Sequence, residues 1–213
     1  MPRPIGPQRL EARRRCLERH AAVEDPAKVL DAAARFLEVR SRSVDEVRRH
    51  LTVARYPADL SERAIARLLE LGMLDDRAFG RAWVESRDRA RPRGEQALRR
   101  ELRIKGLDRE LIAEVLAERA SEGEPGDVFG PPGLASSGVV EPGAERRAAE
   151  KLLARRGAAL ARIADPRARR QRAYALLARN GFGPEICREA SARLIAADVA
   201  GADLPNSDAA DEP

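Results

Sequence analysis

The sequence predicts an all-α protein built from three tandem three-helix repeats. Three observations favour this fold. Ala, Leu, Arg and Glu, which are good helix formers, dominate the chain, whereas β-branched residues are scarce and aromatic residues make up only 3%. One short pattern recurs three times, and Gly and Pro fall between the predicted helices. Because each repeat can bury only a small core, the repeats are expected to lean on one another in an elongated, modular molecule.

The recurring pattern is an apolar pair followed by a residue that ends a helix. Leu98 and Leu102 lie eight and four positions before Gly106, and Leu107 follows it. This spacing indicates an amphipathic helix with a left-handed C-cap. The same offsets hold for two further sets, Ala173, Leu177, Gly181 and Phe182, and Val47, Leu51, Arg55 and Tyr56. Since the cap position of the first repeat holds Arg55 instead of Gly, that cap is expected to be weaker.

Each copy of the pattern is flanked by two further predicted helices. A helix precedes it at 27–40, at 76–89 and at 144–163, and a helix with one apolar face follows it. The predicted organisation is a basic, flexible N-terminal segment at 1–24, repeats at 25–74, 75–120 and 144–199, a Gly/Pro-rich flexible linker at 121–143, and an acidic disordered tail at 200–213.

Two adjacent aspartates open the second repeat. Asp75 is predicted to cap a helix by accepting from the backbone amide of residue 77 or 78, and Asp76 lies in the first turn, where the helix dipole favours a negative charge. Leu74 and Phe79 occupy the two positions of a hydrophobic staple. A structural role for the pair is therefore favoured over a catalytic or metal-binding one.

The sequence shows no pattern that is typical of an enzyme. Metal or acid–base chemistry would need further carboxylates or histidines at one place, but His20 and His50 stand alone on charged segments. No phosphate-binding Gly-rich loop, nucleophile motif or Cys/His pairing is present. We therefore expect no catalytic residue, no metal and no cofactor.

Composition also predicts the environment of the chain. No apolar run is long enough to span a membrane, and the N-terminus lacks the apolar stretch of a secretory signal, so we expect a soluble, cytoplasmic protein. Cys16 and Cys187 are far apart in sequence and are expected to be reduced or buried. No self-complementary apolar stripe is evident beyond the core, which favours a monomer.

The net charge of +5 is unevenly distributed. Residues 87–105 hold 8 basic and 3 acidic side chains, residues 145–179 hold 11 and 3, and the tail after residue 200 is acidic. This distribution indicates a polyanionic partner, either nucleic acid or an acidic protein face, although solvated helix faces would give the same pattern. The candidate contact residues are Arg87, Arg89, Arg91, Arg93, Arg99, Arg100, Arg103 and Lys105 in one set and Arg167, Arg169, Arg170 and Arg172 in another.

Direct recognition of nucleic acid is a competing hypothesis. The basic helices carry few side chains that recognise adenine, namely Gln96, Gln171 and Asn180. Phe79 and Trp83 lie on an apolar stripe, where core packing is favoured over base stacking. Non-specific binding to phosphates without any protein partner stays open.

Several motifs of this chain resemble those of the bacterial RecX regulatory proteins. They are GMLDD followed by Phe79 and Arg87, the stretch RGEQALRRELRIKGL, and ARNGF in the third repeat; the resemblance covers about residues 27–194. Two departures are Met73, where an aromatic residue is usual, and the long linker before the third repeat. The resemblance implies three tandem three-helix repeats.

The same resemblance implies a partner and a function. It implies a protein that binds the filament of RecA recombinase on single-stranded DNA, lies along the helical groove of that filament, and acts in DNA repair and the SOS response. Such a protein restrains strand exchange, ATP hydrolysis and the coprotease activity of the recombinase. The alternative is a helical, non-specific DNA-binding protein that acts without a recombinase.

Overall fold

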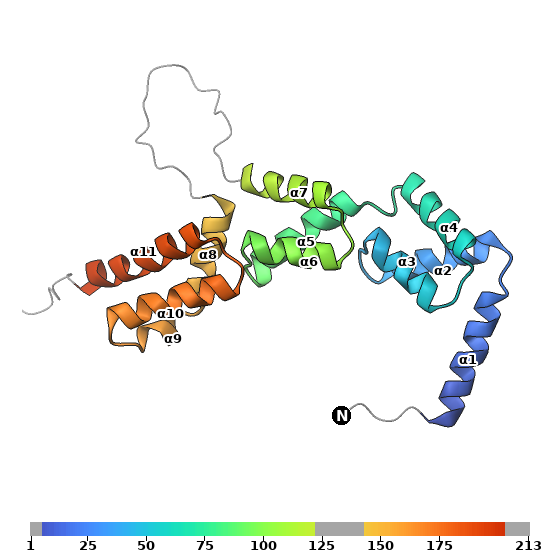
Figure 1. Cartoon of the computed structure of the whole chain (residues 1–213), viewed down its shortest axis with the longest axis horizontal. Helices are drawn as coiled ribbons and strands as arrows, with labels where there is room; N and C mark the ends of the chain where they lie inside the picture. The colour runs from blue at the N-terminus through green and yellow to red at the C-terminus, as the bar shows by residue number, and fades with distance from the viewer. Residues whose placement is uncertain (1–5, 122–142, 203–213) are drawn as a thin grey trace, which may run out of the picture. The chain divides into compact units, whose positions relative to one another are not determined.

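The computed structural model describes residues 6–121 and 143–202, and these residues form α-helices and connecting turns without a β-strand (Figure 1). The predicted linker except its two end residues, and most of the predicted acidic tail, lie outside the described residues. The helices are α1 (Pro7–Ala21), α2 (Pro26–Glu38), α3 (Val44–Val53), α4 (Ala58–Glu70), α5 (Asp76–Ala90), α6 (Glu95–Ile104), α7 (Arg109–Ser121), α8 (Ala144–Arg155), α9 (Gly157–Ala161), α10 (Pro166–Arg179) and α11 (Pro184–Ala202).

Two elements differ from the sequence-based prediction. Helix α1 lies in the segment that was predicted to be flexible, and its charged sequence has no apolar stripe that would reveal it. His20 of α1 stacks on Tyr56 with ring centroids 4.4 Å apart, and its Nδ1 lies 3.0 Å from the carbonyl oxygen of Ala54. His50 stacks on Phe36 at 3.8 Å, so neither histidine stands alone as the sequence suggested.

The second difference is that the helix predicted at 144–163 is two helices. Helix α8 ends at Arg155, and the five-residue α9 begins at Gly157. Glycine in a helix interior is unfavourable because it loses more backbone freedom on folding than any other residue, which makes this position a natural break. Leu160 of α9 is buried, so the short helix still contributes to the core.

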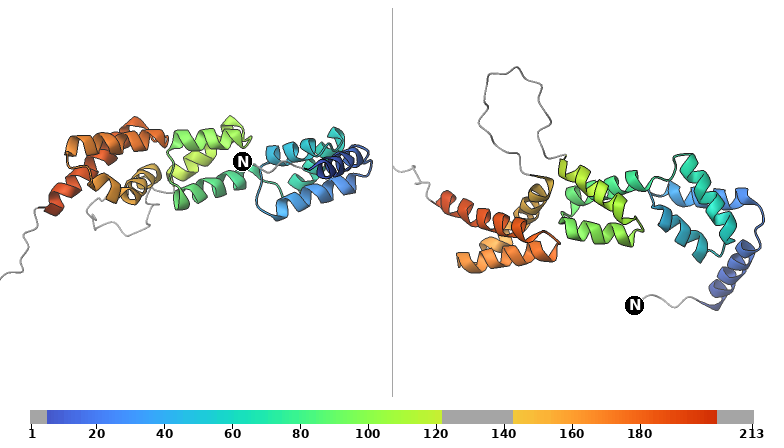
Figure 2. Two further views of the ribbon diagram at one scale, coloured as in Figure 1. Left: turned by 90° about the horizontal axis from the view of Figure 1, so that it is seen from below. Right: turned by 45° about the horizontal axis from the view of Figure 1, so that its top comes forward.

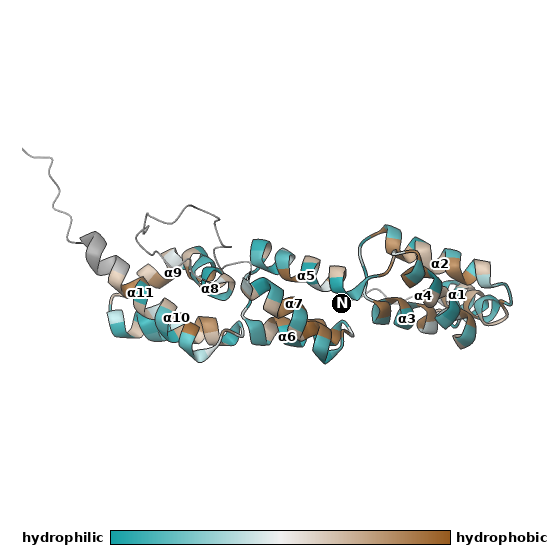
Figure 3. Ribbon diagram, turned by 90° about the horizontal axis from the view of Figure 1, so that it is seen from above, coloured by the Kyte–Doolittle hydropathy of each residue, from teal (hydrophilic) through white to brown (hydrophobic). Residues whose placement is uncertain are grey.

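The apolar pairs of the recurring pattern lie at the centres of the repeats. Each pair is fully buried: Val47 and Leu51 on α3, Leu98 and Leu102 on α6, Ala173 and Leu177 on α10. One core forms around α2, α3 and α4, and another around α8, α9, α10 and α11. Figure 3 shows the corresponding amphipathic character, with hydrophobic and hydrophilic residues on different sides of helices such as α6.

All three cap positions of the pattern adopt the left-handed conformation. The φ angles are 63° for Arg55, 88° for Gly106 and 83° for Gly181. The first repeat thus uses the same backbone turn as the others but places a side chain where glycine is preferred. The left-handed conformation of Arg55 is the physical reason why we predict a weaker cap in the first repeat.

The chain divides into two compact units, and the boundary runs through α5, α6 and α7. The first unit comprises Met1–Ala82 with Leu102–Ile112, and the second comprises Trp83–Glu101 with Ala113–Pro213. The repeat boundaries inferred from the sequence stay a prediction. Each unit contains one contact region, which we call a joint, between a middle helix and residues of the following repeat.

The joint of the first unit lies at the start of α3. Ser43 caps α3 by accepting from the amide of Glu46, and its hydroxyl donates to the carbonyl oxygen of Lys105 at 2.5 Å. The amide of Val44 donates to Oδ1 of Asp76 at 2.9 Å. A Cβ on Gly106 would lie 2.2 Å from Cβ of Asp45, so no side chain fits at this cap.

The joint of the second unit repeats this arrangement at the start of α6. The amide of Glu95 donates to Oε1 of Glu145 at 3.0 Å, and the amide of Gly94 donates to the carbonyl oxygen of Asn180 at 3.1 Å. A Cβ on Gly181 would lie 2.5 Å from the amide nitrogen of Ala97. In both joints, a carboxylate from the next repeat and a carbonyl just before a left-handed glycine complete the helix N-terminus.

The two aspartates that open the second repeat have different roles. Asp75 caps α5 as predicted, since its Oδ1 accepts from the amides of Arg77 at 2.8 Å and Ala78 at 2.9 Å. Asp76 serves the joint, a role that the sequence analysis missed because its partner, Val44, lies 32 positions earlier. Burial raises the pKa of Asp76, and the charge of Asp75 adds to this, while the hydrogen bond from Val44 opposes it.

We expect Arg55→Gly to raise the free energy of unfolding by about 1 kcal/mol. The left-handed conformation costs a non-glycine residue about 1–2 kcal/mol, and the greater freedom of glycine in the unfolded chain offsets part of that gain. Urea unfolding of the full chain measures the change. Gly106→Ala is the matched control and should destabilise the protein; an Arg55→Gly variant less stable than the parent would contradict the strained cap.

We expect Asp76→Ala to lower the free energy of unfolding by about 1–3 kcal/mol, because the amide of Val44 then lacks its acceptor. Asp76→Asn keeps an acceptor and removes the buried charge, so its stability should equal or exceed that of the parent at pH 7.

The same pair of variants has a defined pH dependence. A carboxyl whose pKa is raised on folding binds more protons in the folded state, so its contribution to stability falls as the pH rises from about 4, the unfolded value. The advantage of Asp76→Asn over the parent should therefore grow with pH in unfolding experiments. A constant difference would show that Asp76 is not the group responsible.

Candidate interaction surfaces

Arg87, the first member of the predicted contact set, is held by its neighbours on α5 and α6. Its Nε donates to Oε2 of Glu101 at 2.6 Å, and its guanidinium carbon lies 4.3 Å above the centroid of the Trp83 ring. Nε1 of Trp83 donates to the same carboxylate oxygen at 2.9 Å. Glu101 therefore joins the tryptophan and the arginine, and Arg87 has a structural role.

Arg93 is also engaged within the second unit. Its Nη1 donates to Oδ1 of Asn180 at 2.6 Å, and its Nε lies at ion-pair distance from Glu101, 3.6 Å. Close by, Arg119 binds Asp88 through two hydrogen bonds of 2.9 and 2.7 Å, with its side chain 6% exposed. The sequence analysis missed this buried pair, since 31 positions separate the residues and no local pattern links them.

Lys105 belongs to the joint of the first unit. Its Nζ donates to Oε1 of Glu46 at 2.7 Å, and Arg40 binds the same carboxylate at 3.1 Å. Burial disfavours the charged carboxylate, but the hydrogen bonds from Lys105 and Arg40 outweigh it and lower the pKa of Glu46. The lysine is thus committed to an intramolecular ion pair.

Three further members of the predicted sets have partners. Arg99 pairs with Glu95 at 2.5 Å one turn away on α6, and Arg89 pairs weakly with Glu85 at 3.5 Å. Arg169 donates from Nε and Nη2 to the carbonyl oxygen of Ile163 at 2.9 and 2.8 Å, which closes the turn before α10.

The remaining six members of the two sets are exposed and have no carboxylate partner in the part of the chain that the structure describes. They are Arg91, Arg100 and Arg103 near or on α6, and Arg167, Arg170 and Arg172 on α10. Unpaired guanidinium groups keep all their donors available for phosphate or carboxylate oxygens. These six residues are the stronger candidates for contact with a polyanionic partner.

The described residues contain no cluster of metal-ligating side chains. Residues 6–121 and 143–202 contain no group of three or more His, Cys, Asp or Glu side chains that could hold a metal ion. Both cysteines are free thiols, and Cys187 is buried. None of the helices in this part of the chain is long and apolar enough to cross a membrane.

These features define a class of protein: a helical repeat protein whose candidate surfaces are rich in arginine. Two family models match the chain in tandem, the first three-helix domain of RecX at residues 30–68 and the second three-helix domain of RecX at residues 75–116. These matches support a bacterial RecX family member, in agreement with the resemblance seen in the sequence motifs.

Curated relatives carry the same family name. The chain is 36% identical to the regulatory protein RecX of Mycolicibacterium smegmatis over 130 residues, which are 61% of this chain and 57% of that protein. It is 36% identical to the regulatory protein RecX of Lactobacillus delbrueckii subsp. bulgaricus over 99 residues, 46% of this chain and 36% of that protein. The matched part is thus less than two thirds of the length of these relatives.

Solved structures confirm the fold class. The crystal structure of RecX from Lactobacillus salivarius matches with a TM-score of 0.60 at 18% identity, over 80% of this chain and 97% of that one. A second crystal structure of a regulatory protein RecX matches with a TM-score of 0.58 at 17% identity, over 86% and 76%. The prediction of an all-α fold with tandem three-helix domains is therefore confirmed.

Arginines with an intramolecular partner and exposed arginines without a carboxylate partner in the described residues should differ in the effect of mutation on stability. Arg87→Ala should lower the free energy of unfolding by about 1–2 kcal/mol, because it removes the 2.6 Å ion pair of Glu101 and leaves this partly buried carboxylate with only the longer ion pair to Arg93. Arg100→Ala should change it by less than about 0.5 kcal/mol, as is usual for an exposed side chain. Chemical unfolding followed by the fluorescence of Trp83 measures both; equal losses would refute this difference.

Proposed function

We propose that this protein regulates a RecA recombinase by binding the filament that the recombinase forms on single-stranded DNA. The tandem match to the first and second three-helix domains of RecX is the observation that carries this proposal. The relatives are named regulatory proteins, which supports a regulatory role for the family. Binding is expected to reduce strand exchange, ATP hydrolysis and coprotease activity, and so to modulate recombinational repair and the SOS response.

Multivalent contact provides the mechanism. Repeats that each present exposed arginines can engage neighbouring recombinase subunits at the same time, and linking the contacts raises the total affinity without any single strong site. A bound copy then hinders the subunit movements that accompany ATP turnover. This mode of action needs no catalytic residue, metal or cofactor. We expect the regulator to be a monomer and to act in the cytoplasm, where the filament forms.

The exposed arginines support a second candidate function, direct binding to nucleic acid without a recombinase. Arg100 and Arg103 on α6, like Arg170 and Arg172 on α10, have no carboxylate partner in the described residues and can bind phosphates. In that case, the affinity for DNA alone should fall steeply with salt. A filament regulator should act well below one copy per recombinase subunit and only when the recombinase is present.

We expect the double variant Arg100→Glu with Arg103→Glu to inhibit the recombinase at least about tenfold less strongly than the parent, since each reversed charge replaces an attraction by a repulsion and tenfold corresponds to only about 1.4 kcal/mol. The measurement is ATP hydrolysis by the cognate recombinase on single-stranded DNA, titrated with the protein. Neither substitution should change the melting temperature, because both side chains are exposed.

Arg15→Glu with Arg19→Glu is the matched control. Both residues are exposed on α1, outside the segments that match the RecX domain models, and the change in net charge is the same. This control should inhibit as the parent does. Equal inhibition by all three proteins would refute the surface on α6, and the absence of inhibition by the parent at any ratio would refute the proposed function.

A further inference from the structure

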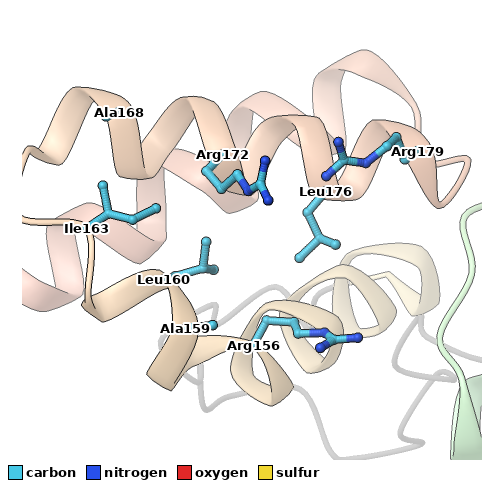
Figure 4. A pocket seen from close by; sticks show the side chains of 8 residues that line it. All are labelled: Arg156, Ala159, Leu160, Ile163, Ala168, Arg172, Leu176 and Arg179. Carbon is cyan, nitrogen blue, oxygen red and sulfur yellow. The ribbon is translucent and has the colours of Figure 1, made fainter.

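The third repeat contains a groove of which only one lining residue, Arg172, belongs to the contact sets described above. The groove has a volume of about 600 Å³ and lies between α9 and α10 (Figure 4). Its floor is apolar, with Leu160 buried and Ile163 and Leu176 partly buried. The remaining lining residues are Ala159 and Ala168 and three arginines, Arg156, Arg172 and Arg179.

The position of the groove follows from the two faces of α10. Ala173 and Leu177 point into the core that α10 shares with α8 and α11. Ala168, Arg172 and Arg179 recur at helical spacing on another stripe, which faces α9. Because α9 has only five residues, it covers this stripe incompletely and leaves the groove open.

The charge of the groove has one sign. None of its lining residues is acidic, and its three arginines are exposed, without a carboxylate partner in the described part of the chain. Two other arginines of the same repeat are paired: Arg146 binds Glu189 at 2.5 Å, and Arg193 binds Glu150 at 3.1 Å. Three cations around an apolar floor therefore fit an anionic segment that also carries apolar side chains.

The chain itself supplies a segment with this chemistry. Residues 203–213 read DLPNSDAADEP, with four acidic residues, one leucine and no basic residue. They follow α11, which packs against α10 and runs antiparallel to it, so the chain leaves α11 toward the side of the repeat on which α10 begins (Figures 1 and 2). Eleven extended residues reach about 36 Å, whereas the stripe from Ala168 to Arg179 spans about 16 Å.

We propose that residues 203–213 dock in the groove between α9 and α10 and neutralise Arg156, Arg172 and Arg179. The tail then acts as an internal competitor that an incoming polyanion must displace. Tethering favours the tail over a separate acidic peptide, because a short linker gives an effective concentration in the millimolar range. The inference does not depend on which partner the protein regulates.

The test places a nitroxide spin label on the tail of the full chain and measures paramagnetic broadening of backbone amide signals. The label is attached at Ser207→Cys in a Cys16→Ser background, which leaves only the buried Cys187 as a native thiol. We expect broadening at Ala159, Ala168 and Arg172, and its loss at high salt. Broadening that is absent, or strongest on α6, would overturn the proposal.

Two charge variants of equal size control the experiment. Arg156→Gln, Arg172→Gln and Arg179→Gln together should abolish the broadening. Arg162→Gln, Arg167→Gln and Arg170→Gln remove three exposed arginines of the same repeat that do not line the groove, and should preserve it. The same result for both triple variants would overturn the docking site. Broadening that appears only between a labelled chain and a separate isotope-labelled chain would show intermolecular contact instead.

A binding measurement gives an independent readout. Asp203→Asn, Asp208→Asn, Asp211→Asn and Glu212→Gln together neutralise the tail of the full chain. If the parent tail fills the groove about 90% of the time, its release should tighten the binding of a polythymidine oligonucleotide about tenfold. Unchanged affinity of the neutral-tail variant, or tightening that persists when the three groove arginines are also changed to glutamine, would refute competition at this groove.

Discussion

The hydrogen bond from the first amide of a middle helix to a carboxylate of the next repeat is the contact on which the organisation of this chain depends. Val44 donates to Asp76 in the first unit, and Glu95 donates to Glu145 in the second. The first amides of a helix have no intrahelical acceptor and otherwise bind water. A carboxylate from the neighbouring repeat therefore accepts a hydrogen bond from an amide that the helix itself leaves unpaired. The left-handed glycines at 106 and 181 permit the close approach that this contact requires.

The hydrogen bonds of the arginines separate those with a structural role from those that are exposed and unpaired in the described residues. Arg87, Arg93 and Arg119 hold helices and turns together within the second unit. Their guanidinium groups donate hydrogen bonds to Glu101, Asn180 and Asp88, respectively. The exposed arginines of α6 and α10 that lack a carboxylate partner in the described residues keep their donors available. Composition alone could not separate the two groups, because both come from the same basic blocks of sequence.

The sequence predicted those features that depend on local periodicity. Buried pairs, left-handed caps and the Asp75 cap all depend on spacings of fewer than ten residues, and all appear as expected. The features it missed depend on distant partners: the bond from Val44 to Asp76, the pair of Arg119 with Asp88, and the packing of α1 through His20. The sequence located the basic stretches but not the arginines within them that form ion pairs, because ion pairs depend on which side chains are close in the folded structure.

The second joint has a consequence for the covalent connectivity of the chain. Its contacts come from residues 94–97, 145 and 180–182, and Lys151 and Arg155 add hydrogen bonds to carbonyl oxygens at the end of α5. None of these groups belongs to residues 122–142. The described contacts of this joint thus connect the flanking parts without the peptide connection, which makes the protein suited to division into two complementing fragments between Ser121 and Gly143.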